Sequence, residues 1–443
     1  MVSTAKPAKS IPSEKGQLPY FNVKGLSGEK PLAGEVEVFG AKNAALKAMA
    51  ASMLFADRLE LHNVPDIEDV RRMAELLRAT GAIVSKTAPH AYLIDVAAAT
   101  NTELDKAIAE RMRSSVVLSG PTLARFGKVQ FPHPGGCVIG ERPIDLFLEG
   151  FRALGAEVTE KENYFEVSGA LTGGEFFFRN VSVTGTETLM MAATLAKGRT
   201  VLKNAAMEPE IEHLAAYLNF SGAKIRGAGT QTIEIEGGEL LRSGGVPYVA
   251  LPDRIEAGSF LILGSLTAKE LVIKNCQPEH FEVLTHTLLR AGVPIEVGKR
   301  EVRIRGNDAK NSSFTGVNIR THEYPGFPTD LQAPMTVFLT QASGEAKVFE
   351  SIFENRLNYT KDLADMGADI TFENPHQVAV RGPRALTGRE LAGPDLRAGL
   401  AFIIAALVAK GDSVINNVYY IDRGYEAIER RLMAIGAPVE RVK

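Results

Sequence analysis

A thiol, a guanidinium group and a carboxylate lie close together in a glycine-rich loop at His133–Asp145. The loop holds Cys137, Arg142 and Asp145 among three glycines and two prolines in thirteen residues, a composition that excludes a regular helix or strand. Pro143 is typical of an early helix position, so we expect Cys137 on a loop that leads to a helix N-terminus, where backbone N–H groups favour anions. The thiol could then act beside an anionic ligand, and an inert, buried cysteine in a turn is the alternative.

Polar residues also occupy the turns that open other predicted helices. Lys42 and Asn43 follow a strand-like segment, Asn180 and Ser182 lie in a similar turn, and Asp330 stands at a predicted helix start. Binding and catalytic residues are concentrated in such turns. Alternatively, Asn43, Ser182 and Asp330 are simple helix caps and Lys42 is a solvated cation.

Four arginines stand in short polar motifs. Arg356, Arg397 and Arg423 each lie within two residues of an acidic side chain, and Arg113 precedes an apolar segment. Guanidinium groups bind phosphate and carboxylate through pairs of parallel hydrogen bonds, so these residues could hold an anionic substrate. Taken one at a time, each could equally be a surface arginine in an ion pair of small energetic gain.

The composition is typical of a globular protein. The 443 residues hold 50 basic and 53 acidic side chains, a net charge of −3, so neither nucleic acid nor an anionic membrane is expected as a partner. The apolar run at residues 398–409 is too short for a membrane span, which needs about 20 residues. Residues 1–18 are polar and lack the apolar core of a signal peptide, so we expect a disordered tail there.

The sequence contains no recognisable cofactor or metal motif. The phosphate loop of nucleoside triphosphatases and the GxGxxG fingerprint after a strand are both absent. The eight histidines include no HxxxH pair and the two cysteines form no CxxC, so neither a metal nor a cofactor is expected. Two cysteines are too few for a disulfide scaffold and fit a reducing cytoplasm, which is the expected location. The oligomeric state stays open.

One phrase recurs six times along the chain: an amphipathic helix, a glycine with a small residue, and a short β-branched strand. Its glycines are separated by 74, 67, 70, 75 and 69 residues, a period that indicates internal duplication. They are Gly81, Gly155, Gly222, Gly292, Gly367 and Gly436. A glycine at this position predicts a left-handed helix end that turns directly into a strand.

A second phrase alternates with the first: a nearly all-apolar helix, a strand, and a polar turn that opens the next helix. Clear examples are residues 191–211, 260–281 and 402–425. Each unit is then βαβαββ, and a helix that is apolar on every face must be central. The pattern predicts six units in two groups of three, with helices inside and sheets outside. A pure interaction scaffold is the alternative, although the units are longer and more mixed than common solenoid repeats.

Six motifs resemble those of UDP-N-acetylglucosamine enolpyruvyl transferases (1-carboxyvinyltransferases), a family similar in fold to 5-enolpyruvylshikimate-3-phosphate synthase. They occur in the family's order, and the resemblance extends from Tyr20 to Lys443. The motifs are GAKNAA at 40–45, PGGCVIGERPID at 134–145, FPTDLQ at 327–332, FENR at 353–356, DLRA at 395–398 and IDRGYE at 421–426.

The resemblance implies an α/β fold, an inside-out α/β barrel of two domains with three βαβαββ units each. One domain would comprise residues 19–41 plus 252–443, and the other residues 42–251, including the Cys137 loop. It also implies an enzyme that transfers the enolpyruvyl group of phosphoenolpyruvate to the 3′-hydroxyl of UDP-N-acetylglucosamine and releases phosphate. This reaction is the first committed step of peptidoglycan precursor synthesis, on which the bacterial cell wall, cell shape and cell division depend.

The same resemblance implies a role for each matching residue. Cys137 is similar to the family's general acid, which can also form a covalent adduct with phosphoenolpyruvate, and Asp330 is similar to a candidate base at the sugar hydroxyl. Lys42 and Arg397 match further catalytic positions, and Arg356 supports the site. The positions that match phosphoenolpyruvate-binding residues are Lys42, Asn43, Arg142 and Arg423. Those that match the UDP-sugar pocket are Arg113, Arg142, Pro143, Ile144, Asp145, Leu146, Asn180, Ser182, Val183, Asp330 and Ile352.

A few residues depart from the family pattern. Asn180 stands where a lysine is usual, Glu141 replaces a small residue in the cysteine loop, and Phe147 replaces a histidine of some relatives. These changes bear on affinity for the sugar nucleotide more than on the chemistry. Two other functions therefore stay open: enolpyruvyl transfer to another nucleotide acceptor such as UMP, and a non-catalytic paralogue that binds sugar nucleotides. The intact Cys137, Asp330 and arginine set argues against the paralogue.

Overall fold

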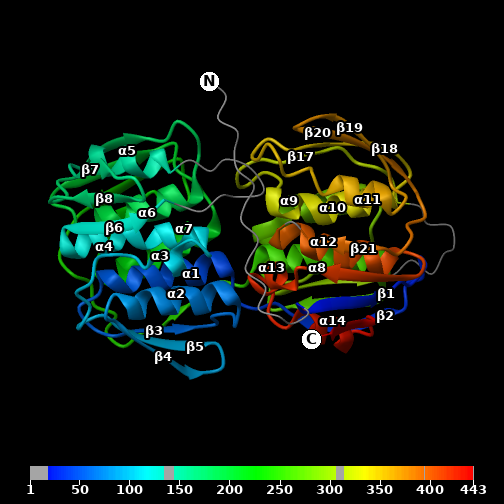
Figure 1. The fold of residues 1–443 in the computed structure, drawn as a ribbon, viewed down its shortest axis with the longest axis horizontal. Helices are drawn as coiled ribbons and strands as arrows, with labels where there is room; N and C mark the ends of the chain where they lie inside the picture. The colour runs from blue at the N-terminus through cyan, green and yellow to red at the C-terminus, as the bar shows by residue number, and fades with distance from the viewer. Residues whose placement is uncertain (1–17, 134–143, 306–313, 394, 443) are drawn as a thin grey trace.

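The chain forms two lobes with separate hydrophobic cores, which lie side by side in Figure 1. The computed structural model describes residues 18–133, 144–305, 314–393 and 395–442. The middle lobe has its core in residues 41–250. The terminal lobe takes its core from residues 21–38 and 255–439. Of the predicted tail, only Leu18, which is exposed, belongs to the described residues.

The sixfold helix–glycine–strand phrase is confirmed. All six glycines have positive φ, between 91° and 112°, the left-handed conformation that a glycine adopts without steric cost. The helices that precede them are α2 (Glu68–Ala79), α5 (Asp145–Ala153), α7 (Pro209–Phe220), α9 (Glu282–Arg290), α11 (Thr360–Asp365) and α14 (Ile428–Ala434). The strands that follow are β4 (Ile83–Ala88), β7 (Glu157–Glu160), β11 (Lys224–Arg226), β15 (Ile295–Val297), β19 (Asp369–Asn374) and β23 (Val439–Val442).

A second set of helices forms the inside of each lobe, as the apolar phrase predicts. Every residue of the two helices that begin at Arg254 and Gln332 is buried, which only a central position allows. The set comprises α1 (Lys42–Ala51), α4 (Ser119–Phe126), α6 (Val183–Thr194), α8 (Arg254–Thr267), α10 (Gln332–Thr340) and α12 (Leu396–Val408). No helix in the described part of the chain is long and apolar enough to cross a bilayer.

The sheets lie on the outside of the lobes (Figure 1). Five described sheets share one pattern, in which a parallel pair is extended by two antiparallel strands. In the middle lobe they run β13 (Tyr248–Val249)-β3 (Leu59–His62)-β5 (Ala91–Asp95)-β4 and β9 (Gly174–Phe177)-β10 (Arg199–Lys203)-β12 (Thr232–Glu236)-β11. In the terminal lobe they run β2 (Leu32–Glu37)-β14 (Ala268–Lys274)-β16 (Glu301–Arg305)-β15, β17 (Ile319–Arg320)-β18 (Gly344–Phe349)-β20 (Gln377–Gly382)-β19 and β21 (Glu390–Ala392)-β22 (Asp412–Asn416)-β1 (Tyr20–Lys24)-β23.

The remaining sheet has three strands, β6 (Lys128–Pro132), β8 (Tyr164–Ser168) and β7. A single parallel bridge between Glu103 and Gln130 stands where the other sheets have their parallel strand. Each lobe therefore has three repeats, with helices inside and sheets outside. The predicted α/β architecture in two groups of three is confirmed.

The chain passes between the lobes twice, and the two passages lie side by side. Gly40 pairs antiparallel with Pro252, and the N–H of Ala41 donates to the carbonyl of Leu251 at 2.6 Å. The N–H of Asp253 donates to the carbonyl of Phe39 at 2.8 Å. The chain has to pass twice because β1, near its start, pairs with the C-terminal strands β22 and β23. In Figure 1, β1 is the blue strand in the lobe that also contains the red end of the chain. The exact domain boundaries stay a prediction.

The first passage is tightly packed, which predicts a strong effect of a small substitution. A Cβ atom on Gly40 would lie 1.6 Å from the backbone oxygen of Asn63. We expect Gly40→Ala to lower the free energy of unfolding by about 1–3 kcal/mol, measured by urea denaturation, because the backbone must shift. Gly238→Ala is the matched control, since a Cβ there meets nothing within 4 Å. Equal stability of the two variants would contradict the prediction.

Candidate active site

Lys42, Asp69 and Arg423 form a charge cluster across the boundary between the lobes. Lys42 begins α1, as predicted, Asp69 lies in the first turn of α2, and Arg423 directly follows α13 (Val418–Asp422) of the terminal lobe. Nζ of Lys42 lies 2.5 Å from Oδ2 of Asp69. Nε of Arg423 donates to Oδ1 of Asp69 at 2.8 Å and its Nη2 donates to Oδ2 at 3.3 Å. One carboxylate thus holds a cation from each lobe.

The cluster is largely shielded from water, and this shifts its protonation equilibria. The side chain of Asp69 is 1% exposed. Burial would raise the pKa of Asp69, but the charges of Lys42 and Arg423 outweigh burial and hold that pKa below its ordinary value. Burial lowers the pKa of Lys42, and the nearby charges of Arg423 and Arg397 lower it further. Asp69 is the neighbour that opposes the loss of the Lys42 proton.

Asp330 forms a second cluster with two buried arginines of the terminal lobe. It lies in a 3₁₀ turn, η4 (Thr329–Leu331), which leads into α10. Nη2 of Arg356 donates to Oδ1 of Asp330 at 2.8 Å, and Nε of Arg397 donates to Oδ2 at 3.0 Å. The arginine side chains are at most 5% exposed, whereas that of Asp330 is 27% exposed. The surface-pair alternative for the two arginines and the helix-cap alternative for Asp330 are therefore wrong.

Arg397 is held by partners distant in the sequence. Its neighbour Asp395 instead caps α12, accepting the N–H groups of Arg397 at 2.7 Å and Ala398 at 3.2 Å. Nη1 of Arg397 donates to the hydroxyl of Tyr425 at 2.9 Å. Burial acts against its charge, but Tyr425 and the carboxylates of Asp330 and Asp253 outweigh burial and raise the pKa of Arg397. Arg397 is therefore a permanent cation.

Asp253 joins the two clusters at the lobe boundary. Its Oδ1 caps α8 by accepting the N–H groups of Ile255 at 2.8 Å and Glu256 at 3.1 Å. Its Oδ2 accepts the N–H of Lys42 at 3.4 Å, so the first turns of a middle-lobe helix and a terminal-lobe helix share one carboxylate. Burial raises the pKa of Asp253, which Arg397 counteracts. The arrangement concentrates three cations from both lobes in one place.

Several of the residues expected to hold the sugar nucleotide lie at or just before the starts of two middle-lobe helices. Ile144 and Leu146 are buried at the start of α5, and Asp145 forms an ion pair with Arg179. Asn180 is exposed. Ser182 precedes α6, whose first residue is Val183, and accepts the N–H of Gly185 at 3.1 Å. The cap alternative for Ser182 is thus confirmed, which leaves its hydroxyl hydrogen available to a ligand.

Other predicted residues are placed separately or lie outside the described residues. Arg113 begins the 3₁₀ helix η2 (Arg113–Leu118), and Asn43 is the second residue of α1 without a capping role. The N–H of Ile352 donates to Oε1 of Glu350 at 2.9 Å. The predicted residues outside the described ranges are Cys137, Arg142 and Pro143, together with Glu141. Their roles stay predictions.

The family model described as EPSP synthase (3-phosphoshikimate 1-carboxyvinyltransferase) matches residues 26–432, across both lobes. The chain belongs to the EPSP synthase family. The resemblance drawn from the six sequence motifs is confirmed at this level.

Curated relatives of this EPSP synthase family member match almost end to end. A UDP-N-acetylglucosamine 1-carboxyvinyltransferase of Desulforapulum autotrophicum is 42% identical over 419 residues, which cover 94% of this chain and 99% of the relative. A protein of the same name from Solibacter usitatus is 44% identical over 421 residues, with 94% and 99% coverage. The chain is therefore similar in sequence to proteins of this name along both of its lobes.

Solved structures in the comparison share the fold at low sequence identity. The enolpyruvyl transferase NikO from Streptomyces tendae superposes with a TM-score of 0.85 at 22% identity, covering 96% of this chain and 99% of that structure. EPSP synthase from Acinetobacter baumannii gives a TM-score of 0.71 at 16% identity, covering 96% and 100%. The two-lobe arrangement of repeats is therefore that of the enolpyruvyl transferases.

Four residues that the fold of this EPSP synthase family member brings to the site were not identified from the sequence. Asp69 and Asp253 bridge the lobes, Tyr425 binds Arg397, and Arg179 pairs with Asp145. Tyr425 lies within the recognised IDRGYE motif, so its signal was present. Arg179 is exposed and directly precedes Asn180, so a cation remains next to the position where the family lysine is missing.

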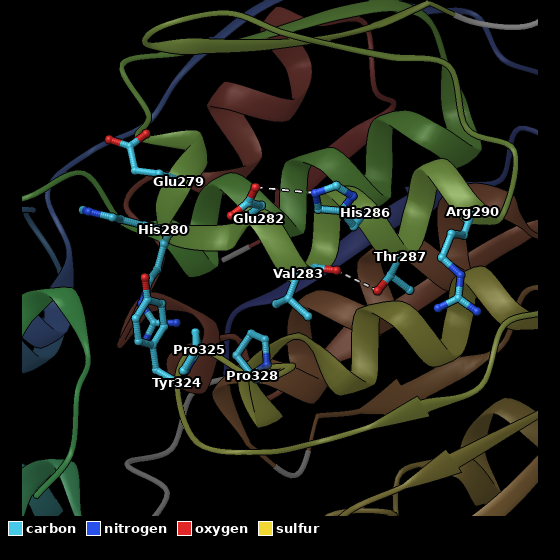
Figure 2. A pocket seen from close by; sticks show the side chains of 12 residues that line it. Glu279, His280, Glu282, Val283, His286, Thr287, Arg290, Tyr324, Pro325 and Pro328 are labelled. Carbon is cyan, nitrogen blue, oxygen red and sulfur yellow. Dashed lines mark hydrogen bonds and ion pairs between the residues drawn. The ribbon is translucent and has the colours of Figure 1, made fainter. Parts of the chain in front are cut away.

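A cavity of about 520 Å³ lies beside the Asp330 loop, and its lining includes Arg254, the residue after Asp253. Figure 2 shows the His280 and His286 side chains on one of its sides and Tyr324 with Pro328 on the other. Pro328 lines the cavity and is two residues before Asp330 in the sequence. The described lining residues have mixed charge and include none of the predicted site residues, so we assign the site to the clusters and not to the cavity.

Proposed function

We propose that this chain is a UDP-N-acetylglucosamine 1-carboxyvinyltransferase, which transfers the enolpyruvyl group of phosphoenolpyruvate to the 3′-hydroxyl of UDP-N-acetylglucosamine and releases phosphate. The observation that carries the proposal is the gathering of Lys42, Arg397 and Arg423 from both lobes, beside Asp330. Relatives with 42–44% identity bear this name. In the cell it would supply peptidoglycan precursors from the cytoplasm.

The cation cluster suits phosphoenolpyruvate, which carries a phosphate and a carboxylate on one small carbon skeleton. Lys42, Asn43, Arg142 and Arg423 would hold these groups. Bond formation joins the sugar oxygen to C2 of phosphoenolpyruvate while C3 gains a proton. In the second step C3 loses a proton and the C2–O bond to phosphate breaks. The cations stabilise the phosphate leaving group, and they do so in a poorly solvated site where charge interactions are strong.

Two groups would move protons. Asp330 would accept the proton of the 3′-hydroxyl, and its orientation is fixed because each oxygen accepts a hydrogen bond from a buried arginine. Cys137 would donate the proton to C3, since a thiol with an ordinary pKa of about 8.5 is mostly protonated at pH 7. Arg397 would orient Asp330 and contact the reacting groups, and Arg356 would support the base.

The nucleotide would bind along the middle lobe at the starts of η2, α5 and α6, where backbone N–H groups favour anions. The residues proposed to hold it are Arg113, Arg142, Pro143, Ile144, Asp145, Leu146, Asn180, Ser182, Val183, Asp330 and Ile352. The two domains would comprise residues 19–41 plus 252–443 and residues 42–251, in line with the two hydrophobic cores. Substrates would bind between them.

Phosphate release from phosphoenolpyruvate, measured with a panel of acceptors, tests the proposal. We expect turnover with UDP-N-acetylglucosamine, and mass spectrometry should find the enolpyruvyl group on the acceptor. Turnover with UMP but not with UDP-N-acetylglucosamine would replace the proposed acceptor. Binding of UDP-N-acetylglucosamine by calorimetry without phosphate release from any acceptor would support the non-catalytic paralogue instead.

Replacing Cys137 with serine should lower turnover about a hundredfold or more, because a hydroxyl is a much weaker acid than a thiol. The measurement is steady-state phosphate release at saturating substrates. Cys276→Ala is the matched control: the Cys276 thiol is buried in the terminal lobe, and burial raises its pKa to about 11. We expect the control to keep near-full turnover. An unchanged rate in Cys137→Ser would remove the assigned role.

A further inference from the structure

We propose that Asp69 is a positioning residue, whose carboxylate keeps Lys42 and Arg423 of opposite lobes assembled as one binding site for phosphoenolpyruvate. This inference rests on the proposed function and deepens it. None of the six sequence motifs contains Asp69. The proposal follows from its contacts, its burial and the charges around it.

The carboxylate of Asp69 contacts the side chains of Lys42 and Arg423 at the same time. Its Oδ1 accepts from Nε of Arg423 at 2.8 Å, while its Oδ2 lies 2.5 Å from Nζ of Lys42 and 3.3 Å from Nη2 of Arg423. A carboxylate in the first turn of α2 is already favoured by the helix dipole. Both of its oxygens nevertheless bind cations from other elements, so its role extends beyond its own helix.

Without this carboxylate the two cations would repel each other across the lobe boundary. The substrate would then have to bring Lys42 and Arg423 together, and the cost of ordering them would be subtracted from its binding free energy. With Asp69 in place, two positive charges share one negative charge, so the cluster stays net positive and already has its spacing. Preorganised cations of this kind stabilise an anion without further rearrangement.

Asp69 also governs how Lys42 titrates. The charged groups that face Lys42 are Asp69 on α2, Arg423 after α13 and Arg397 on α12, with Asp253 at the Lys42 backbone N–H. Burial and both arginines lower the pKa of Lys42, and Asp69 raises it. If Asp69 loses its charge, the pKa of Lys42 falls further. Lys42 then becomes neutral at a lower pH and no longer attracts the phosphate.

The test is Asp69→Asn, with steady-state kinetics measured against pH at varied phosphoenolpyruvate and UDP-N-acetylglucosamine. We expect KM for phosphoenolpyruvate to rise about ten- to a hundredfold, the range for a lost charged hydrogen bond, and KM for UDP-N-acetylglucosamine to stay within about twofold. The alkaline limb of the kcat/KM profile for phosphoenolpyruvate should move to lower pH. Asp95→Asn is the control, because that middle-lobe carboxylate binds the exposed Arg58 and the N–H of Ala97, away from the site.

Asp69→Glu separates charge from folding. It keeps the negative charge, so its alkaline limb should stay near that of the wild type even if KM rises. A folded Asp69→Asn variant with unchanged KM and an unchanged alkaline limb would overturn the inference, as would a Glu variant that shifts like the Asn variant. Absence of wild-type turnover would overturn the proposed function instead. Calorimetric binding of phosphoenolpyruvate to wild type and Asp69→Asn would then still decide the role of Asp69.

Discussion

Replacing Asp330 with asparagine should lower turnover by about a hundred- to ten-thousandfold, the usual contribution of a general base. The amide is neutral and does not accept the proton of the sugar hydroxyl. The effect on binding should be smaller, because Arg356 can still donate to the amide oxygen at the place of Oδ1. The amide NH₂ would face Nε of Arg397, which is also a donor, so we expect a modest loss of stability as well. Pre-steady-state phosphate release at saturating substrates measures the chemical step directly.

Asp369→Asn is the matched control for Asp330→Asn. Asp369 also contacts two arginines, Arg384 at 2.6 Å and Arg381 at 3.8 Å, but it lies on the outer strand β19. Its replacement should leave turnover unchanged, because exposed ion pairs contribute little and no substrate is proposed near it. Loss of turnover in both variants would indicate a general effect of removing carboxylates, and full turnover of Asp330→Asn would remove its proposed role.

Replacing Arg254 with methionine should lower the free energy of unfolding by about 3–5 kcal/mol, the typical effect of breaking a buried ion pair. Arg254 begins α8 in the terminal lobe, and its Nε lies 3.1 Å from Oε1 of Glu210 on α7 of the middle lobe. Both side chains are at most 10% exposed. The substitution removes the main counter-charge of the buried Glu210 and of the neighbouring Glu208, and Lys47 acts on Glu210 more weakly than Arg254 does. Urea denaturation at pH 7 measures the loss.

The stability loss in Arg254→Met should depend on pH, and the pKa of Glu210 determines in which direction. In the wild type, burial would raise the pKa of Glu210, but Arg254 outweighs it and holds the pKa below its ordinary value. The pair therefore stabilises the fold above the unfolded-state pKa and loses that effect as pH falls. Without Arg254, burial should outweigh the weaker effect of Lys47 and raise the folded-state pKa of Glu210, so the deficit should shrink as pH falls from 7 toward 4.

A double variant, Arg254→Met with Glu210→Leu, provides the control. It should regain about 1 kcal/mol or more relative to Arg254→Met alone, because no uncompensated charge remains at that position. Strictly additive losses in the two single variants would show that the side chains do not interact across the lobe boundary. A pH-independent deficit would contradict the assigned role of Glu210.

The fold could be predicted because its signals are local and repeated. Gly81 and its five counterparts end a helix in a conformation that other residues rarely adopt, so they mark each helix–strand junction in the sequence itself. The all-apolar stretches at α8 and α12 leave only a central position open to them. Repetition of these two signals therefore specified both the layers and the grouping in threes.

The charge partners of the site could not be predicted in the same way. Arg397 lies two residues after Asp395, yet it pairs with Asp330 of the preceding repeat and with Tyr425, 28 residues further along the chain. Asp69 stands in a helix rich in ordinary charged residues, and nothing in its neighbourhood separates it from Glu68 or Glu75. Contacts between lobes depend on the packing of distant segments, so a sequence pattern names the candidate cations but not the carboxylates between them.

The position of β1 has a consequence for biosynthesis. Phe21 lies opposite both Ile415 and Arg441, so the first strand of the described residues is the central partner of two strands that are made about 400 residues later. The whole middle lobe is translated between these events, and as one continuous segment it can fold while the nascent chain is still growing. Strands β1 and β2 therefore keep unpaired edges until β22 and β14, their partners, have been made, and unpaired strand edges are prone to aggregation.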